Sequence, residues 1–118
     1  GANNVAVGAN AADANTTGGY NIAVGQNSLG ANTTGNYNTA LGNSALWRNT
    51  TGDMNVAIGV SALSANTTGD YNIAMGNLAM GSNTTGDNNT GIGYYALLSN
   101  TTGTPMRLDT PSTSILVE

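Results

Sequence analysis

The side chains that could do chemistry in this 118-residue chain are few, and most of them recur at one fixed spacing. Cysteine and histidine are both absent, which removes thiolate chemistry, the commonest general base and the commonest transition-metal ligand. The carboxylates of Asp53, Asp70 and Asp87 stand 17 residues apart, and the sequence provides no second acid to work opposite them. We therefore expect no catalytic residues and no enzyme.

The same three aspartates are the only candidate metal ligands. If equivalent residues stack on one edge of the fold, their carboxylates repel one another. A bound Ca²⁺ would relieve that repulsion, because this ion prefers carboxylate oxygens. Solvent screening would relieve it as well, and the alternating Gly-Asp pattern of calcium-binding rolls is missing. We expect no metal and no other cofactor, with Ca²⁺ at Asp53, Asp70 and Asp87 as the alternative.

The charge balance excludes two classes of partner. The net charge is −4, with two arginines, six acids and no lysine, so there is no basic surface to neutralise nucleic-acid phosphates. No stretch approaches the roughly 18 consecutive apolar residues of a membrane span. The chain starts without the basic segment of a signal peptide, and we interpret it as part of something longer.

The element that must position these side chains is an internal repeat. The tetrapeptide Asn-Thr-Thr-Gly at residues 15–18 returns every 17 residues as far as 100–103. Its Asn is position 1 of a unit whose copies are 1–14 (truncated), 15–31, 32–48, 49–65, 66–82, 83–99 and the start of a seventh at 100–103. Such a unit is too short for two helices, and Gly at positions 4 and 11 weakens a single one. We therefore predict a coil of strand and turns.

The strand of each coil is placed by an alternation of period two, as in residues 20–24, 54–58 and 71–75. Gly at position 11 ends it, where a positive φ or a close backbone approach needs a residue without Cβ. A second short strand is expected at positions 14 and 15, as in Ser28-Leu29 and Ala45-Leu46. The Asn-Thr-Thr-Gly segment closes the coil as a turn, in which Asn bonds the local backbone and Gly tolerates the left-handed region.

Stacking of these coils predicts an all-β parallel solenoid, or β-roll, of about six coils that rise roughly 4.8 Å each. Equivalent residues then form ladders, which are columns of like side chains in successive coils. Stacked asparagine amides can bond their neighbours above and below. The expected structural ladders are Asn4, Asn21, Asn38, Asn55, Asn72 and Asn89 at position 7, and Gly8, Gly25, Gly42, Gly59, Gly76 and Gly93 at position 11.

The two faces of the strand lead us to expect more than one chain. We expect the apolar residues of positions 8 and 10, such as Ile22 and Val24, to face the interior against the leucines of position 15. The small residues of position 9 would then face outward and allow close approach of another copy, most simply in a side-by-side homotrimer. The alternative is a single-chain solenoid whose thin lumen demands alanine. The position 9 residues are Ala6, Ala23, Ala40, Ala57, Ala74 and Gly91.

The Asn-Thr-Thr segments carry two further candidate functions. Adjacent residues in extended chain point oppositely, so only one threonine of each pair can form an outward row that matches ice or sugar. We favour the alternative in which the hydroxyls satisfy turn backbone groups. Each Asn is also a glycosylation sequon, and we expect an exposed corner at Asn15, Asn32, Asn49, Asn66, Asn83 and Asn100, with Asn88 as a further acceptor.

Aromatic residues supply the last candidates. Tyr20, Tyr37 and Tyr71 share position 6, where they either stack on sugar rings or cover neighbouring backbone. Trp47 with Arg48 has no counterpart in the other copies, and a departure in one copy is either a recognition site or drift. The candidate ligand contacts are Trp47, Arg48, Tyr94 and Tyr95.

The segments NVAVG, NIAVG, NVAIG and NTALG resemble the repeat of trimeric autotransporter adhesin heads, and the last three are followed by Ser/Ala-Leu. That resemblance implies a left-handed parallel β-roll in which three chains pack side by side. The rhythm ALxxNTTGxxNxAxG is similar to repeats of bacteriophage tail fibres, whereas adhesin heads usually have shorter units. The resemblance covers about residues 1–103, and residues 104–118 would be an exit segment leading to a further domain or coil.

We accordingly expect a non-enzymatic segment of an extracellular fibre, on a virion tail or a bacterial cell surface, that supports host or surface attachment. Its partners would be copies of itself in a homotrimer and a host-surface glycan or protein receptor. The alternative is a monomeric solenoid that binds ice or polysaccharide through its threonine or tyrosine ladders.

Overall fold

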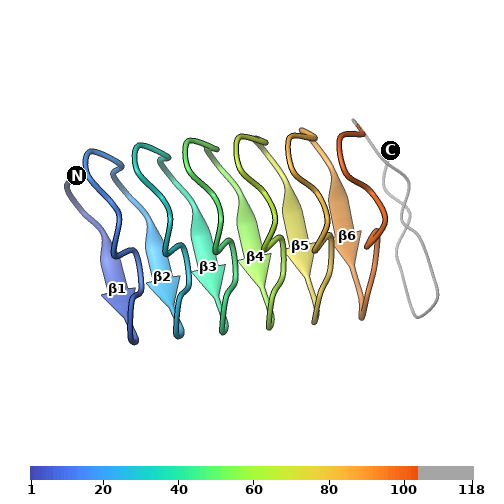
Figure 1. Ribbon diagram of the computed structural model, residues 1–118, viewed down its shortest axis with the longest axis horizontal. Helices are drawn as coiled ribbons and strands as arrows, with labels where there is room; N and C mark the ends of the chain where they lie inside the picture. The colour runs from blue at the N-terminus through green and yellow to red at the C-terminus, as the bar shows by residue number, and fades with distance from the viewer. Residues whose placement is uncertain (104–118) are drawn as a thin grey trace.

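The computed structural model describes residues 1–103, and the expected exit segment at 104–118 lies outside the described residues. The described chain is a single parallel sheet in which every strand neighbours the next in sequence (Figure 1). The strands are β1 (Val5–Val7), β2 (Ile22–Val24), β3 (Thr39–Leu41), β4 (Val56–Ile58), β5 (Ile73–Met75) and β6 (Thr90–Ile92). Helices are absent from this part of the chain, so it contains none that could cross a membrane.

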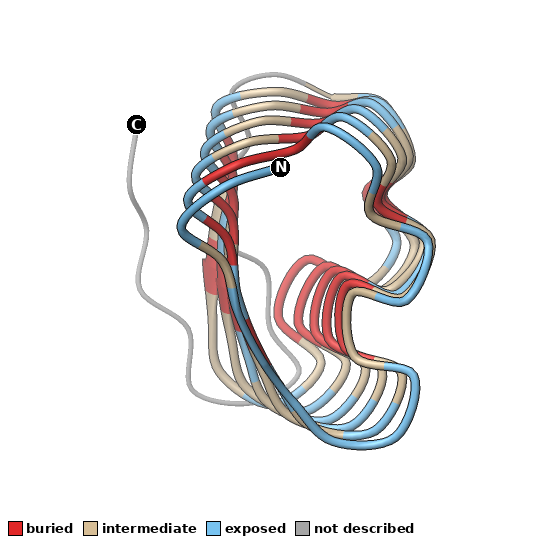
Figure 2. Ribbon diagram, turned by 90° about the vertical axis from the view of Figure 1, so that its left-hand side faces the viewer, coloured by how far each residue is buried: buried red, intermediate tan, exposed pale blue. Residues whose placement is uncertain are grey.

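The sheet confirms that each 17-residue unit winds once and lies on its predecessor. In β2 and β3, Ala23 pairs with Ala40, and in β3 and β4 Ala40 pairs with Ala57. The solenoid measures 36 × 22 × 17 Å along its principal axes. Seen from the N-terminal end in Figure 2, the chain runs anticlockwise as it recedes, so the coils wind left-handedly.

The interior is lined by the smallest residue of each strand, and the prediction that positions 8 and 10 face inward is wrong. Ala23 is fully buried, whereas Ile22 and Val24 on either side of it are 40% and 38% exposed. The physical reason is the width of the lumen, which the position 15 side chains fill from the opposite wall. Close contact across it allows only a methyl group on the strand, as the alternative of a thin lumen predicted. The buried apolar residues include Ala23, Ala40, Ala57 and Ala74 with Leu29, Leu46, Leu63, Met80 and Leu97.

Positions 14 and 15 form turns, so the prediction of a second strand there is also wrong. Leu63 at position 15 has a φ of 52°, and Ser61 at position 13 has a φ of 56°. Neither residue type favours this left-handed conformation, so the sequence does not predict it. The left-handed residues bend the chain inward and deliver the leucine to the lumen. The backbone still bonds between coils, because the Leu46 amide donates to the Ala62 carbonyl at 3.0 Å.

The two invariant glycines of the unit serve different purposes. Gly59 at position 11 has a φ of +128°, and a Cβ there would lie 2.7 Å from the backbone of Gly76 in the next coil. Gly69 at position 4 is outside the left-handed region, contrary to prediction. A Cβ on it would lie 2.5 Å from both the Asn66 Oδ1 atom and the Gly86 carbonyl oxygen, so close packing of coils requires this glycine.

Candidate functional site

The position 7 asparagines form a buried amide ladder in the wall of the solenoid. Asn55 donates from Nδ2 to the carbonyl oxygen of Gly69 at 2.8 Å and to the Asn38 Oδ1 atom at 3.2 Å. Its own Oδ1 accepts from the backbone amide of Asn72 at 3.0 Å and from Asn72 Nδ2 at 3.1 Å. Every hydrogen-bonding atom of this side chain is therefore satisfied without water, which is what burial of an amide demands.

A second amide ladder runs through position 1, so the expectation of an exposed, glycosylatable corner is wrong. Asn49 Nδ2 donates to Asn32 Oδ1 at 3.0 Å and to the carbonyl oxygen of Gly52 at 2.9 Å. That same carbonyl also accepts from Asn38 of the preceding coil at 2.8 Å. The side chains point inward because they hold the corner together. The buried members are Asn32, Asn49, Asn66, Asn83 and Asn100, with Asn15 partly buried in the first coil.

The two threonines of each corner have different surroundings. The Thr50 hydroxyl at position 2 donates to the carbonyl oxygen of Thr67 in the next coil at 3.0 Å. Its neighbour Thr51 at position 3 is exposed. The backbone role therefore falls to one threonine of each pair, and the outward row consists of Thr17, Thr34, Thr51, Thr68, Thr85 and Thr102.

The aspartate column at position 5 is held by backbone donors. Asp70 Oδ1 accepts from the amide of Asp53 at 2.7 Å, and Asp87 Oδ1 accepts from the amide of Asp70 at 2.8 Å. A carboxylate is thereby stabilised by an amide dipole in the preceding coil. Within residues 1–103, no group of three acidic, histidine or cysteine side chains is arranged to hold a metal ion.

Most of the exposed large apolar side chains lie on the outer sheet face, which we define as positions 6, 8 and 10 of all six coils. Tyr20 and Tyr37 stack in it with ring centroids 4.9 Å apart and planes 2° from parallel. The face contains no charged residue. The residues of positions 8 and 10 were predicted to face inward, because period-two alternation separates two faces without saying which one is buried. Its most exposed apolar members are Val5, Val7, Tyr20, Ile22, Tyr37, Met54 and Tyr71.

The loop face, defined as positions 12 to 17 on the side opposite the sheet, carries the residues that break the repeat (Figure 2). Trp47 is 43% exposed, and the Arg48 guanidinium carbon lies 5.3 Å from the centroid of its ring. Tyr94 and Tyr95 meet edge to face with centroids 4.2 Å apart. A hydrogen bond with Tyr95 is the main cause that raises the pKa of Tyr94 above the ordinary value of 10.0.

The structure keeps the two pairs of repeat-breaking residues in separate coils, the first in the coil of β3 and the second in that of β6. The described surface has no pocket. No family model, no curated protein and no solved structure matches the chain.

Proposed function

We propose that the chain is a structural and adhesive segment of an extracellular fibre, built from copies that pack side by side through the outer sheet face. The observation that carries the proposal is the exposure of an uncharged, largely apolar surface along the whole solenoid. Contiguous apolar patches of more than a few hundred Å² are rare on monomers and mark interaction sites. Here such a patch is built into all six coils.

The composition of the outer sheet face supports a copy of the same chain as its occupant. Its β2 and β5 coils contribute Ile22 with Val24 and Ile73 with Met75, and the equivalent positions of the other coils are valine, leucine, isoleucine or threonine. Two such faces are complementary to each other because neither has a charge to desolvate. A polar surface would gain nothing from this contact.

We propose three copies around an axis parallel to the fibre. The strand side forms one wall of the cross-section in Figure 2, so each copy can turn this wall toward a common axis. A threefold rotation axis gives a closed assembly in which the outer sheet face of every copy is in contact with other copies.

The mechanical role follows from the direction of the hydrogen bonds. Backbone and asparagine bonds join every coil to the next along the long axis, so load is spread over many parallel bonds. Burial of the outer sheet face between copies would add lateral stability and remove its apolar surface from water. Such a rod can hold an attachment site away from a particle or a cell.

Sedimentation of the native 118-residue chain tests the proposed assembly directly. The chain mass is 11.8 kDa, and we expect a species of three times that mass in physiological buffer. Ile73→Asp places a charge on β5 within the outer sheet face and should shift the chain to monomer. A native chain that sediments as a monomer at high micromolar concentration contradicts the assembly.

Val60→Asp is the matched control for this substitution. Val60 is 48% exposed, compared with 37% for Ile73, and lies at position 12 on the loop face. The same chemical change there should leave the assembly intact. Circular dichroism of both variants separates loss of assembly from loss of fold.

The outward threonine row favours a second candidate, a monomeric solenoid that binds ice or polysaccharide. All six position 3 threonines are exposed at one coil spacing, and the stacked pair Tyr20 and Tyr37 offers an aromatic surface. Inhibition of ice recrystallisation by a monomeric chain, lost in Thr51→Asp, would support this function in place of the fibre.

A further inference from the structure

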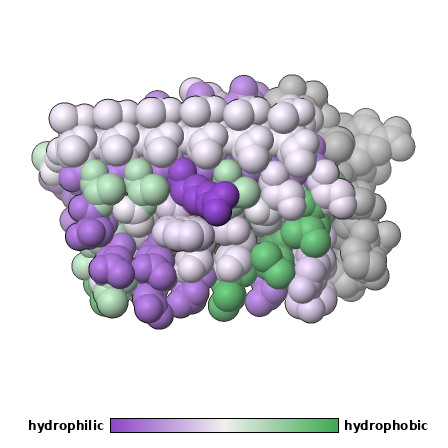
Figure 3. All heavy atoms as spheres, viewed as in Figure 1, coloured by the Kyte–Doolittle hydropathy of each residue, from purple (hydrophilic) through white to green (hydrophobic). Residues whose placement is uncertain are grey.

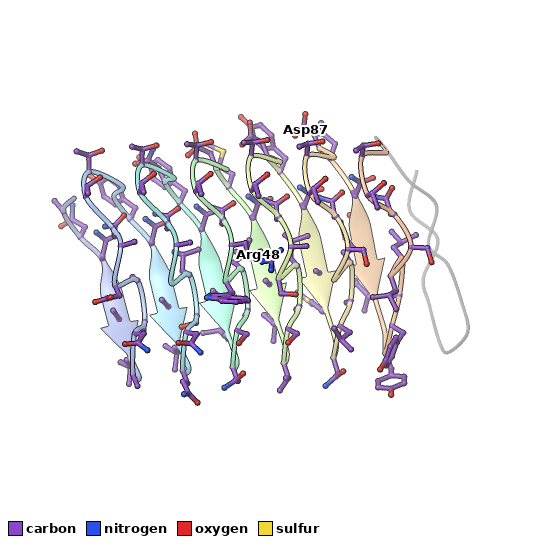
Figure 4. All side chains as sticks on the ribbon, viewed as in Figure 1. Arg48 and Asp87 are labelled. Carbon is purple, nitrogen blue, oxygen red and sulfur yellow. The ribbon has the colours of Figure 1, made fainter. Side chains whose placement is uncertain are left out.

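The pair Trp47 and Arg48 is the most distinctive feature of the loop face. Figure 4 places Arg48 in front of the strands, on the side turned away from the outer sheet face. Figure 3 shows the deepest hydrophilic colour of this side confined to one spot near its middle, with pale atoms around it. The surroundings are small residues, because positions 16 and 17 of the adjoining coils are Gly30 with Ala31 and Ser64 with Ala65.

These small neighbours leave the indole accessible. Trp47 leans toward the preceding coil, where a methyl group added at Gly30 would lie 3.3 Å from Trp47 Cδ1. A larger residue at Gly30 would meet the ring, whereas glycine supports it and leaves 43% of Trp47 exposed. An aromatic ring that served to cover backbone would be more deeply buried.

The guanidinium of Arg48 is available to a ligand. Within residues 1–103 it is the only side-chain cation. Among these residues, its one side-chain interaction is the cation–π contact with the Trp47 ring. The carboxylates of the described chain, Asp13, Asp53, Asp70 and Asp87, form no ion pair with it. The guanidinium lies at cation–π distance over the indole, and its five donors can bind an anion.

We infer that Trp47 and Arg48 form a binding site for an acidic carbohydrate, a pyranose that carries a carboxylate. The apolar C–H face of the sugar ring would stack on the indole, as sugars do on exposed aromatic rings. The carboxylate would accept two parallel hydrogen bonds from the guanidinium. A neutral sugar would contact only the indole, and a simple anion would hydrogen-bond only to the arginine.

The site is independent of the proposed assembly, because the loop face lies opposite the outer sheet face (Figure 2). If copies pack through their sheets, each adds one equivalent site on the outside of the fibre. Several weak sites on one rod bind a polymeric ligand with greater avidity than a single site. An acidic polysaccharide on a cell surface has the repeated carboxylates that such an arrangement requires.

Tryptophan fluorescence tests the site without a label, because Trp47 is the only tryptophan of the chain. The native 118-residue chain is titrated with an oligomer of galacturonic acid and, separately, with the corresponding neutral galactose oligomer. We expect a saturable change of emission with the acidic oligomer and binding at least about tenfold weaker for the neutral one. Absence of any change up to about 10 mM acidic sugar overturns the inference.

Three variants identify the chemistry. Arg48→Gln should reduce the affinity for the acidic oligomer about tenfold while the neutral oligomer is unaffected, and Arg48→Lys should lose less because charge remains. Asn77→Ala, an exposed substitution on the same face, is the matched control and should bind as the native chain does. Equal binding by Arg48→Gln would overturn the site.

Competing ligands separate a sugar site from a general anion site. Dextran sulfate and a glutamate-rich peptide are titrated at the same ionic strength. Tighter binding of the sulfated polymer or of the peptide than of the galacturonic acid oligomer overturns the assignment to a carboxylated sugar. Sedimentation of each variant reads the assembly separately, so failure of one proposal does not imply failure of the other.

Discussion

The individual residue that most defines this molecule is a buried asparagine. Two amide columns, at positions 1 and 7, converge on the carbonyl oxygen of the position 4 glycine, as Asn49 and Asn38 do on Gly52. A buried amide costs free energy unless all its donors and acceptors are paired. The repeat solves this problem by supplying each amide with an identical amide in the next coil.

Replacement of one ladder asparagine by aspartate should therefore be severe. Asn55→Asp removes the two Nδ2 donations to Gly69 and Asn38 and buries a negative charge beside their oxygens. We expect the free energy of unfolding to fall by about 3 kcal/mol or more, because an unsatisfied buried charge is costlier than a lost neutral hydrogen bond. Urea unfolding monitored by circular dichroism measures the change.

Asn77→Asp is the matched control for this prediction. Asn77 is exposed at position 12, where water solvates either side chain. The free energy of unfolding should change by less than about 0.5 kcal/mol. Equal effects at the two sites would mean that the ladder bonds contribute nothing specific to stability.

The ladder also has an end. Among the described residues, Asn89 Oδ1 is the one buried side-chain nitrogen or oxygen atom without a hydrogen-bond partner. In the sequence, the seventh unit carries Met106 where the earlier units have asparagine at position 7. The position 1 column continues to Asn100, whose Nδ2 donates to Asn83 Oδ1 at 3.4 Å.

At the scale of the element, each coil is fitted to the coil next to it. Four of the five complete repeats have leucine at position 15, whereas the coil of β5 has Met80. The following strand, β6, has Gly91 where every other strand has alanine at position 9. A Cβ on Gly91 would lie 2.8 Å from Met80 Cγ and 3.2 Å from its Sδ. The longer methionine and the missing methyl group therefore compensate for each other across the lumen.

This compensation predicts a coupled pair of substitutions. Gly91→Ala alone should lower the free energy of unfolding by about 1–3 kcal/mol, the usual cost of overpacking a dense core. In the Met80→Leu background, the pair becomes the leucine and alanine of the other coils, and most of that loss should disappear. Thermal or urea unfolding of the two single variants and the double variant gives the coupling free energy. Strict additivity would show that the two side chains do not compete for the same space.

At the scale of the whole molecule, the structure is a one-dimensional stack. Each coil contacts its neighbours only, so stability is the sum of coil terms and interface terms. The two long sides differ in character, with an uncharged sheet face and a polar loop face that carries Trp47 and Arg48. Division of the surface in this way would let the proposed assembly and the proposed ligand binding take place on opposite sides of one rod.

A stack of this kind should accept removal of a whole coil. Deletion of residues 66–82 joins Ala65 directly to Asn83 and keeps every column in register. We expect the β-sheet circular dichroism spectrum per residue to be retained, a rod shortened by roughly 4.8 Å, and a lower midpoint of thermal unfolding because one interface is lost. Small-angle scattering measures the length.

Deletion of residues 66–73, about half a coil, is the control. It would place the asparagines of the later coils over unlike residues and rotate apolar side chains to the wrong face. The chain should lose cooperative unfolding. If both deletions behave alike, the coils are not stacked in register.

The sequence by itself determined the coil and its repetition. A fixed 17-residue period, glycine at positions 4 and 11 and the alternation around Ala23 were enough to predict a parallel solenoid with an asparagine ladder through residues such as Asn55. These features are local or periodic, and stacking of like over like follows from periodicity alone. The outward row of one threonine per pair was likewise predicted from the opposite directions of adjacent side chains.

Only the tertiary structure decided which side of the strand is the inside. Ile22 and Val24 have the apolar character of core residues, yet they are exposed while Ala23 is buried, because the width of the lumen is set by the leucines that enter from the other wall. The left-handed backbone at Leu63 and the inward direction of the Asn49 side chain also depend on the tertiary structure. Local propensity favours neither, and both exist because bonds and contacts with the neighbouring coils outweigh the local cost.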